Sequence, residues 1–234
     1  MNAPDTRRAL CLFDLDHTLL PLDSDHAFGT FLVRIGWVDG DEFRRRNDIY
    51  YRQYQAAALD IDAYIEHATR PWRDRPAAEV EAMRARFMAE VIAPKIHPKA
   101  LELVAEHQRA GDLVAIVTAT NEFVTAPIAA AFGVPHLIAV ELERDASGTI
   151  DGRIRGVPSY REGKVVRVGQ WLNALGHDWS DFPRSTFYSD SMNDVPLLEH
   201  CSDPVATNPA PALESLAVQR GWRILKLFHD QEAD

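Results

Sequence analysis

Short apolar runs alternate along the chain with segments of helical periodicity. Residues 9–13 form a continuous apolar run that ends at Asp14, a pattern typical of a strand buried on both faces of a parallel sheet. Similar runs recur at 113–117, 137–140, 186–188 and 205–206, and 224–227 has the character of an edge strand. Helical segments lie between most of them, at 100–110, 123–132, 165–175 and 212–220, each followed by the glycine that often ends a helix. This alternation predicts an α/β fold with a doubly wound parallel sheet.

Residues 20–95 interrupt this alternation and show helical periodicity only. Apolar residues recur at helical spacing over 28–35, before Gly36, and again over 80–91, after Pro76. We therefore predict an α/β core made of residues 1–19 and 96–234, with a helical cap, residues 20–95, inserted after the first strand. Residues 141–158 contain two turn signals, Ser147-Gly148 and Asp151-Gly152, and predict a small hairpin.

Composition and charge narrow the classes of protein that fit. The chain has 234 residues, of which 46% are hydrophobic, so it can bury a full core. A formal net charge of -10 argues against nucleic acid or an anionic membrane as a partner, because no surplus of Lys and Arg exists to neutralise phosphates. The two cysteines suggest no disulfide framework, and neither a signal peptide nor an apolar run of about 18 residues is evident. We expect a cytoplasmic protein, and the sequence does not indicate its oligomeric state.

Two acidic residues follow the first strand directly, in the string Asp14-Leu15-Asp16-His17-Thr18. Ligands of open α/β sheets bind beyond the carboxyl ends of the strands, so a reactive group is expected here. Two carboxylates held together repel each other unless a cation or a shared proton relieves them, and such pairs are usually functional. An acidic turn or a helix cap would account for one of the two Asp residues well and for both poorly.

Three later segments place further chemistry at strand ends or helix starts. Thr118-Ala119 follows the second strand, where a hydroxyl and free N–H groups can hold phosphate oxygens, although a helix cap would explain the same residues. Lys164 begins a helix and would either be solvated or point into the site and bind a phosphoryl group. Asp190, Asn193 and Asp194 follow a further strand and offer the hard oxygen ligands that Mg²⁺ prefers.

The ordered set of these motifs resembles the haloacid dehalogenase-like phosphatase superfamily, and the helical insertion resembles the cap of its phosphoserine phosphatase-like branch. The resemblance implies an enzyme, a phosphomonoester hydrolase, in which Asp14 is the nucleophile and Asp16 the general acid and base. It implies that Thr118, Ala119 and Lys164 bind the phosphoryl group. Mg²⁺ would be held by Asp14, the backbone carbonyl of Asp16 and Asp190. The supporting residues of that site would be Asp194, Asn193 and Thr18.

Two other functions fit part of this pattern. A phosphotransferase or mutase of the same superfamily would share every motif and differ in the acceptor. A regulatory phospho-acceptor like a receiver domain would also combine acids, a Thr, a Lys and Mg²⁺, but receivers are about half this length and have no cap.

Substrate choice is expected to depend on the cap and on the loop that carries Asp16. Asp23 falls where phosphoserine phosphatases have a Glu that contacts the substrate amine, so it suggests an amino-bearing phosphate ester such as phosphoserine or histidinol phosphate. A helix cap explains Asp23 equally well. Arg45 and Arg52 would suit a carboxylate clamp, and His17 would touch either substrate or the cap. Tyr50, Tyr51, Tyr54 and Trp72 would line a pocket or, more commonly for aromatics at helical spacing, form cap core.

Overall fold

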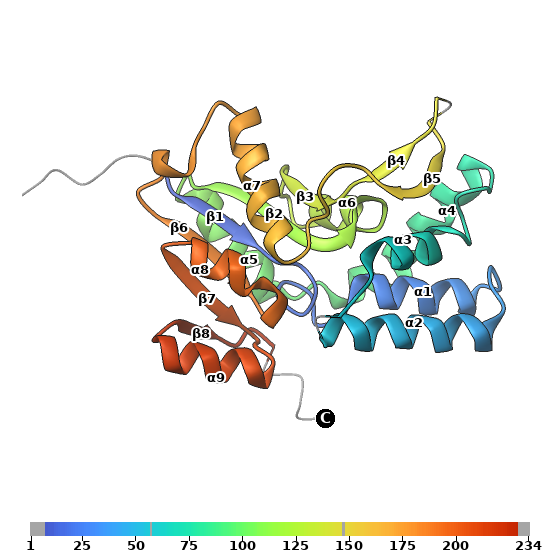
Figure 1. The fold of residues 1–234 in the computed structure, drawn as a ribbon, viewed down its shortest axis with the longest axis horizontal. Coiled ribbons are helices and arrows are strands. Elements are labelled where there is room, and N and C mark those ends of the chain that lie inside the picture. Colours follow the sequence, from blue (N-terminus) through green and yellow to red (C-terminus); the bar gives the residue numbers. More distant parts are fainter. Residues whose placement is uncertain (1–7, 57, 147, 229–234) are drawn as a thin grey trace, which may run out of the picture.

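A six-stranded sheet forms the centre of one half of the molecule (Figure 1). The computed structural model describes residues 8–56, 58–146 and 148–228. The strands, in spatial order, are β3 (Leu137–Val140), β2 (Leu113–Asn121), β1 (Leu10–Phe13), β6 (Ser185–Ser189), β7 (Asp203–Thr207) and β8 (Arg223–Leu225). Every neighbouring pair is parallel. The chain moves from β1 out to β3 and then returns to β6 on the other side of β1, which makes the sheet doubly wound, as predicted.

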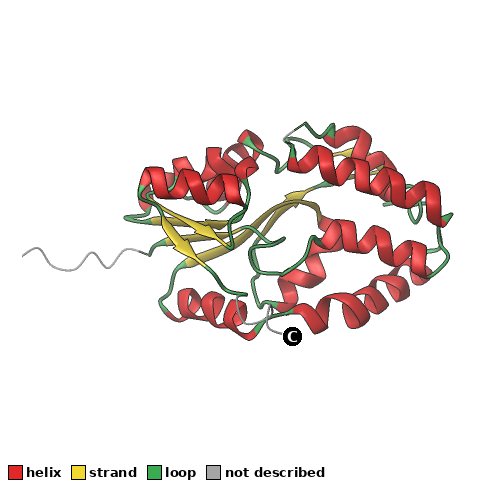
Figure 2. Ribbon diagram, turned by 90° about the horizontal axis from the view of Figure 1, so that it is seen from below, coloured by secondary structure: helices red, strands yellow, loops and turns green. Residues whose placement is uncertain are grey.

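Helices cover both faces of this sheet (Figure 2). They are α5 (Pro98–Arg109), α6 (Glu122–Ala131), α7 (Glu162–Ala174), α8 (Val195–His200) and α9 (Pro211–Arg220). Because side chains alternate along a strand, Leu10 and Leu12 of β1 pack with α7, α8 and α9, whereas Cys11 and Phe13 pack in a second cluster with α5 and α6. The predicted helices are present, and each of the four predicted terminal glycines has a positive φ. Only α8, six residues long and with proline in its first turn, is absent from the prediction.

The other half of the molecule is mainly helical and lies beyond the carboxyl ends of β1 and β2 (Figure 1). We call residues 24–95 the helical region. It contains α1 (Ser24–Arg34), α2 (Gly40–Gln55), α3 (Ile61–Thr69) and α4 (Ala77–Phe87), and ends in a π-helical turn (Met88–Ile92) and a 3₁₀ turn (Ala93–Lys95). Two further 3₁₀ turns, Trp179–Asp181 and Met192–Asp194, lie in the sheet half. Phe28, Phe31 and Phe87 belong to the same apolar cluster as α5 and α6, so the two halves share one continuous core.

The predicted hairpin is present as β4 (Leu142–Arg144) and β5 (Ile150–Ile154), which pair antiparallel. The hairpin packs on the helical region rather than on the sheet, with β5 against α3. Arg73 of the helical region donates to the carbonyl of Asp151 in β5 at 3.3 Å and also forms an ion pair with Glu66 of α3. The predicted turn at Ser147-Gly148 falls partly outside the described residues, since residue 147 is not described. The hairpin therefore connects the sheet half to the helical region at a second place.

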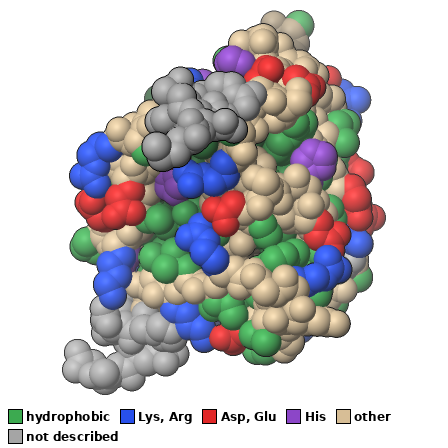
Figure 3. Space-filling view, turned by 90° about the vertical axis from the view of Figure 1, so that its left-hand side faces the viewer, with side chains coloured by type: hydrophobic (Ala, Val, Ile, Leu, Met, Phe, Trp, Pro, Cys, Tyr) green, Lys and Arg blue, Asp and Glu red, His purple; other side chains and the backbone are tan. Residues whose placement is uncertain are grey.

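The surface at one end of the molecule carries charges of both signs. On the face at the end of the molecule away from the helical region, Lys and Arg side chains are interspersed with Asp, Glu and hydrophobic ones (Figure 3). Among the described residues, no helix is both long enough and apolar enough to cross a membrane.

Candidate active site

Asp14 follows the central strand β1 directly, and its side chain is only 6% exposed. Its backbone N–H donates to the carbonyl of Tyr188 at 2.9 Å, which continues the pairing of β1 with β6 by one residue. One carboxylate oxygen accepts from Lys164 Nζ at 2.8 Å and the other from Thr18 Oγ1 at 3.3 Å. Burial raises the pKa of Asp14 to about 6, while the charge of Lys164 opposes that rise. The carboxylate is therefore fixed in position by segments far apart in the sequence.

Lys164 is completely buried although it lies on the first turn of α7. Its Nζ contacts Asp14 at 2.8 Å and Asp194 at 2.7 Å, and Asp194 also accepts from Ser189 Oγ at 2.7 Å. Burial alone would lower the Lys164 pKa, but the two carboxylates outweigh it and hold that pKa above its usual value. Lys164 is thus a permanently charged group beside Asp14 rather than a solvated surface residue.

Asp16 lies on the same loop and faces the helical region. One of its oxygens accepts from the backbone N–H of Ser24 at 2.8 Å, and the other accepts from Thr120 Oγ1 at 2.9 Å. Burial, and after it the neighbouring charge of Asp23, hold the pKa of Asp16 well above its usual value. The environment therefore shifts Asp16 toward its protonated form, the form that a general acid requires.

The loop that carries these acids is held by Asn208 at the end of β7. The Asn208 amide donates to the carbonyls of His17 at 3.0 Å and Thr18 at 3.2 Å, while its side-chain oxygen accepts from the backbone N–H of Leu227 at 2.6 Å. His17 has a φ of 57°, a left-handed conformation that explains why a small residue would suit this position. Its Nε2 shares a hydrogen bond of 3.3 Å with the Tyr51 hydroxyl, so His17 connects the loop to α2.

Thr118 and Ala119 lie near the carboxyl end of β2, where the pairing with β3 changes register after Val117. The Thr118 hydroxyl accepts from the backbone N–H of Thr120 at 3.1 Å. Both Thr118 and Ala119 line the same pocket as Asp14. Asn121, two residues later, is the N-cap of α6, and its side-chain oxygen accepts from the backbone N–H of Val124. The segment 118–121 therefore provides both pocket lining and a helix cap.

The acids at this edge of the sheet suit a hard cation. The Thr18 hydroxyl can give its one proton to Asp14 or to Asp190, at 3.3 and 3.2 Å, and it accepts from the Asp190 backbone N–H at 3.1 Å. Burial, then the charges of Asp14 and Asp194, raise the pKa of Asp190 well above its usual value. Within the described part of the chain, no three His, Cys, Asp or Glu side chains are grouped so as to hold an ion by themselves. Two carboxylates and a backbone carbonyl nevertheless fit Mg²⁺, which keeps several water ligands.

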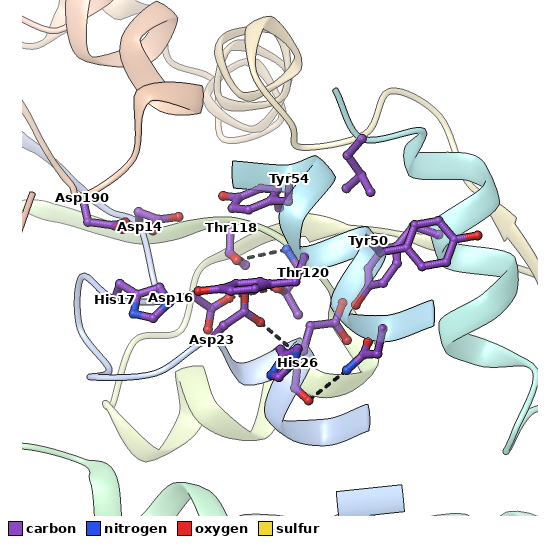
Figure 4. Close-up of a pocket in the computed structure, with 16 residues that line it drawn as sticks. Asp14, Asp16, His17, Asp23, His26, Tyr50, Tyr54, Thr118, Thr120 and Asp190 are labelled. Atoms are coloured by element: carbon purple, nitrogen blue, oxygen red, sulfur yellow. Dashed lines mark hydrogen bonds between the residues drawn. The ribbon is translucent and has the colours of Figure 1, made fainter. Parts of the chain in front are cut away.

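A pocket extends from these acids into the helical region (Figure 4). Figure 4 shows Asp14 and Asp190 at one end of it and Tyr50 at the other, with Tyr54, Thr118 and Thr120 between them. Tyr50, Tyr51 and Tyr54 come from one face of α2 and line the pocket, whereas Trp72 is buried and stacks on Phe123 at 4.0 Å. The remaining lining comes from the start of α1, from α2 and α3 and from the segment between them: Asp23, Asp25, His26, Asn47, Leu59 and Tyr64.

Comparison with known proteins agrees with this geometry. A model of the haloacid dehalogenase-like hydrolases matches residues 11–199. The chain belongs to this family. It is 41% identical over 216 residues to a histidinol-phosphatase of Neisseria meningitidis, a match that covers 92% of this chain and 97% of the relative. The chain is therefore a phosphatase of the haloacid dehalogenase-like family, and the prediction of family and enzyme class is confirmed.

Solved structures of similar proteins support the fold of the phosphatase. A Bordetella pertussis protein of unknown function has 50% sequence identity and a TM-score of 0.89, over 95% of this chain and 100% of that one. A substrate-bound phosphoserine phosphatase has only 16% identity but a TM-score of 0.66, over 94% of this chain and 93% of the other. At that identity the likeness concerns the fold, and it confirms the predicted α/β class.

The phosphatase does not bring every candidate residue to the pocket. Arg45 pairs with Glu42 at 3.0 Å and is largely exposed, and Arg52 is exposed as well; neither lines the pocket. The reason is the phase of α2: the residues at 47, 50, 51 and 54 share the face toward the pocket, and Arg45 and Arg52 lie away from it. The expected carboxylate clamp is therefore not formed by these two arginines.

Two other candidates have structural partners. Asn193 is buried and donates to the carbonyl of Tyr54 at 2.9 Å, so it joins the loop after β6 to the end of α2. Asp23 accepts from the backbone N–H of His26 at 2.8 Å as the N-cap of α1, and it also lines the pocket. The position of Asp23 is thus compatible both with capping α1 and with contacting a substrate amine.

Several residues that were not among the predicted candidates lie at the site of the phosphatase, and three of them have clear roles there. Thr120 hydrogen bonds to Asp16, Asn208 holds the loop carbonyls, and Asp25 lines the pocket as a buried carboxylate. A signal existed for Thr120, because it lies two residues after Thr118 on the same strand. For Asp25 the sequence offers only a second Asp near a helix start, which is common on surfaces.

Proposed function

We propose that this phosphatase hydrolyses a small phosphomonoester with a positively charged leaving group, of which histidinol phosphate is the leading candidate, through an aspartyl phosphate formed on Asp14. The observation that carries the proposal is the Asp14 carboxylate, fixed between Lys164 and Thr18 at the end of a pocket. We also propose that residues 20–95 act as the cap over a core of residues 1–19 and 96–234.

The charge balance at Asp14 supports its role as nucleophile. A phosphomonoester at neutral pH is a dianion and repels a carboxylate, so positive charge must be present before the two can approach. Lys164 supplies one positive charge at 2.8 Å from Asp14. Mg²⁺ held by Asp14, the Asp16 carbonyl and Asp190 would supply the remainder and orient the phosphoryl oxygens. Thr118 and Ala119 line the pocket, and the Thr118 hydroxyl and the Ala119 N–H would bind those oxygens.

The reaction then proceeds in two steps. In the first, an Asp14 oxygen forms a bond to phosphorus, the ester P–O bond breaks, and Asp16 gives its proton to the leaving alcohol oxygen. In the second, Asp16 accepts a proton from water, whose oxygen attacks phosphorus and releases phosphate from Asp14. The raised pKa of Asp16 supports the first step, because it favours the protonated form before the leaving group departs.

The charge of the pocket favours a cationic leaving group. Five carboxyl side chains line it, those of Asp14, Asp16, Asp23, Asp25 and Asp190, and none of the described lining residues is Lys or Arg. Phosphoserine carries a carboxylate that needs a positive partner, whereas histidinol phosphate carries an amine and an imidazole but no carboxylate. The relative from Neisseria meningitidis is named a histidinol-phosphatase. Both points support histidinol phosphate over phosphoserine as the substrate.

A phosphate-release screen with and without Mg²⁺ tests the proposal. The panel contains some tens of phosphomonoesters, including histidinol phosphate, phosphoserine, phosphoethanolamine, sugar phosphates and nucleotides. We expect release that depends on Mg²⁺ and is fastest for histidinol phosphate. If no ester is hydrolysed the proposed reaction is wrong, and if phosphoserine or a sugar phosphate is the better substrate the proposed leaving group is wrong. Transfer of phosphate to an added alcohol in preference to water would favour a phosphotransferase.

A further inference from the structure

Asp25 is a buried carboxylate that the proposed chemistry does not use. It lies in the first turn of α1, lines the pocket and is only 6% exposed. Oδ1 accepts a long hydrogen bond of 3.5 Å from the Asn121 amide. Among the described residues, Oδ2 has no hydrogen-bond partner in good geometry, and neither has the hydroxyl of the adjacent Ser24.

An unpaired carboxylate is costly in such a place. Burial, and then the charge of Asp23, raise the pKa of Asp25 to about 7, while the Tyr64 hydroxyl and the His26 ring lower it. The N-terminus of α1 offers some compensation, but buried charges in proteins are generally paired or bind a ligand. Oδ2 is therefore an acceptor without a hydrogen-bond partner, on a residue that lines the pocket.

The surroundings of Asp25 are aromatic and planar. Tyr50 and Tyr64 meet edge to face with ring centroids 5.2 Å apart, and His26 and Tyr51 lie 5.0 Å apart. The Asn47 amide donates to the carbonyl of His26 at 3.2 Å and thereby joins α2 to α1. Aromatic walls around an acid suit a flat, cationic ring, through stacking and cation–π attraction.

Asp23 and Asp25 act on different parts of the site. The charge of Asp23 acts directly on Asp16 and His17, whereas Asp25 interacts with Tyr64 of α3 and with Asn121. In histidinol phosphate the carbon next to the ester carbon carries the amine. A further methylene joins that carbon to the imidazole ring. An extended substrate would thus bring its amine to Asp23 and its ring to Asp25.

We propose that Asp25 is a specificity-determining residue whose Oδ2 accepts a hydrogen bond from a ring N–H of an imidazole-type leaving group. This inference rests on the proposed function and adds the part of the pocket that selects the substrate. Asp25 touches only the leaving group, so its removal changes which ester is preferred rather than how phosphorus is attacked.

Two truncated esters separate the ring from the amine. The first, 3-(imidazol-4-yl)propyl phosphate, keeps the ring of histidinol phosphate and lacks its amine; phosphoethanolamine keeps the amine and lacks the ring. We expect Asp25→Asn to lower the ratio of kcat/KM for the ring ester to that for phosphoethanolamine by about 10- to 100-fold, because the acceptor of the ring N–H loses its negative charge. The product histidinol, titrated by calorimetry, should bind the variant more weakly by a similar factor.

The matched control is Asp62→Asn. Asp62 occupies the same position in α3 that Asp25 has in α1, the second residue of the helix, but it is exposed and lies outside the pocket lining. This variant should leave the ratio and the histidinol affinity at the wild-type values.

The outcomes are distinct. A ratio within about threefold of wild type in folded Asp25→Asn, or an equal loss for both esters, overturns the role of Asp25 and leaves the proposed function standing. Failure of the wild-type enzyme to release phosphate from histidinol phosphate and from both truncated esters overturns the proposed function and this inference together. Folding of the variant is checked by its thermal midpoint, which should equal or exceed that of the wild type because an unpaired buried charge has been removed.

Discussion

The carboxylates at the two ends of the pocket differ in their hydrogen-bond partners and in the charges beside them. At the sheet end, Asp14 and Asp16 each accept hydrogen bonds on both oxygens, and Lys164 adds a positive charge. At the helical end, Asp25 accepts one long hydrogen bond from Asn121 and interacts with the Tyr64 hydroxyl, and the described lining contains no Lys or Arg. The sheet end is organised before any ligand binds, whereas the helical end is completed by what it binds. Electrostatic preorganisation at the reacting atoms and an unfilled recognition site for the leaving group are the arrangement expected of an enzyme with a defined substrate.

The strongest test of the sheet end is Asp14→Asn. An amide is a poor nucleophile toward phosphorus, so we expect phosphate release to fall by at least about 10³-fold, measured with histidinol phosphate at saturating Mg²⁺. The fold should survive, because Asn has the same shape and Lys164 keeps Asp194 as a partner. Wild-type activity in this variant would exclude Asp14 as the nucleophile, and Asp62→Asn serves as the control for a surface Asp.

A second test removes the charge that organises the sheet end. Lys164→Met leaves Asp14 and Asp194 buried without their shared cation, which should lower the free energy of unfolding by about 3 kcal/mol in urea titrations. Adding Asp194→Asn to this variant removes one of the two unpaired carboxylates and should recover part of the loss. No recovery in the double variant would mean that Lys164 stabilises the protein mainly by packing rather than by charge.

The contribution of Asp25 to folding stability should fall as the pH rises, whereas that of an ordinary acid in an ion pair rises with pH. The folded-state pKa of Asp25 is raised to about 7, so its contribution to stability is fully present below about pH 4 and is lost as the pH rises through 7. The extra stability of Asp25→Asn over wild type should therefore grow between pH 5 and pH 8, by about 2 kcal/mol. Asp23, His26 and Tyr64 face Asp25 and are common to both proteins, so the difference isolates Asp25. A difference independent of pH would show that Asp25 keeps an ordinary pKa in the folded protein.

The sequence predicted the sheet end of the site better than the helical end, for a physical reason. Parallel strands align their carboxyl ends, so an acid after β1, a hydroxyl near the end of β2 and an acid after β6 must meet once the sheet is recognised. Helical periodicity shows only that α2 has an apolar face. It does not show which residues face the pocket, and so it favoured Arg52 as a substrate contact over the adjacent Tyr51, which was expected more commonly to form cap core. Asp25 was not found because its burial depends on how α1, α2 and α3 pack together, which local sequence does not encode.

The smallest expected effect comes from the arginines of α2, and it bears on substrate choice. Arg45→Ala and Arg52→Ala should each leave kcat/KM for histidinol phosphate within about twofold of wild type, because both side chains are exposed and outside the pocket lining. The same variants measured with phosphoserine sharpen the comparison between the two ends. If either substitution reduced phosphoserine turnover by more than about tenfold, an arginine would have to reach the carboxylate of a bound substrate, and α2 would have to rotate or shift toward the sheet during turnover. The helical end would then recognise anions as well as cations. Unchanged kinetics with both esters would leave the acidic, tyrosine-lined pocket as the feature that selects the leaving group.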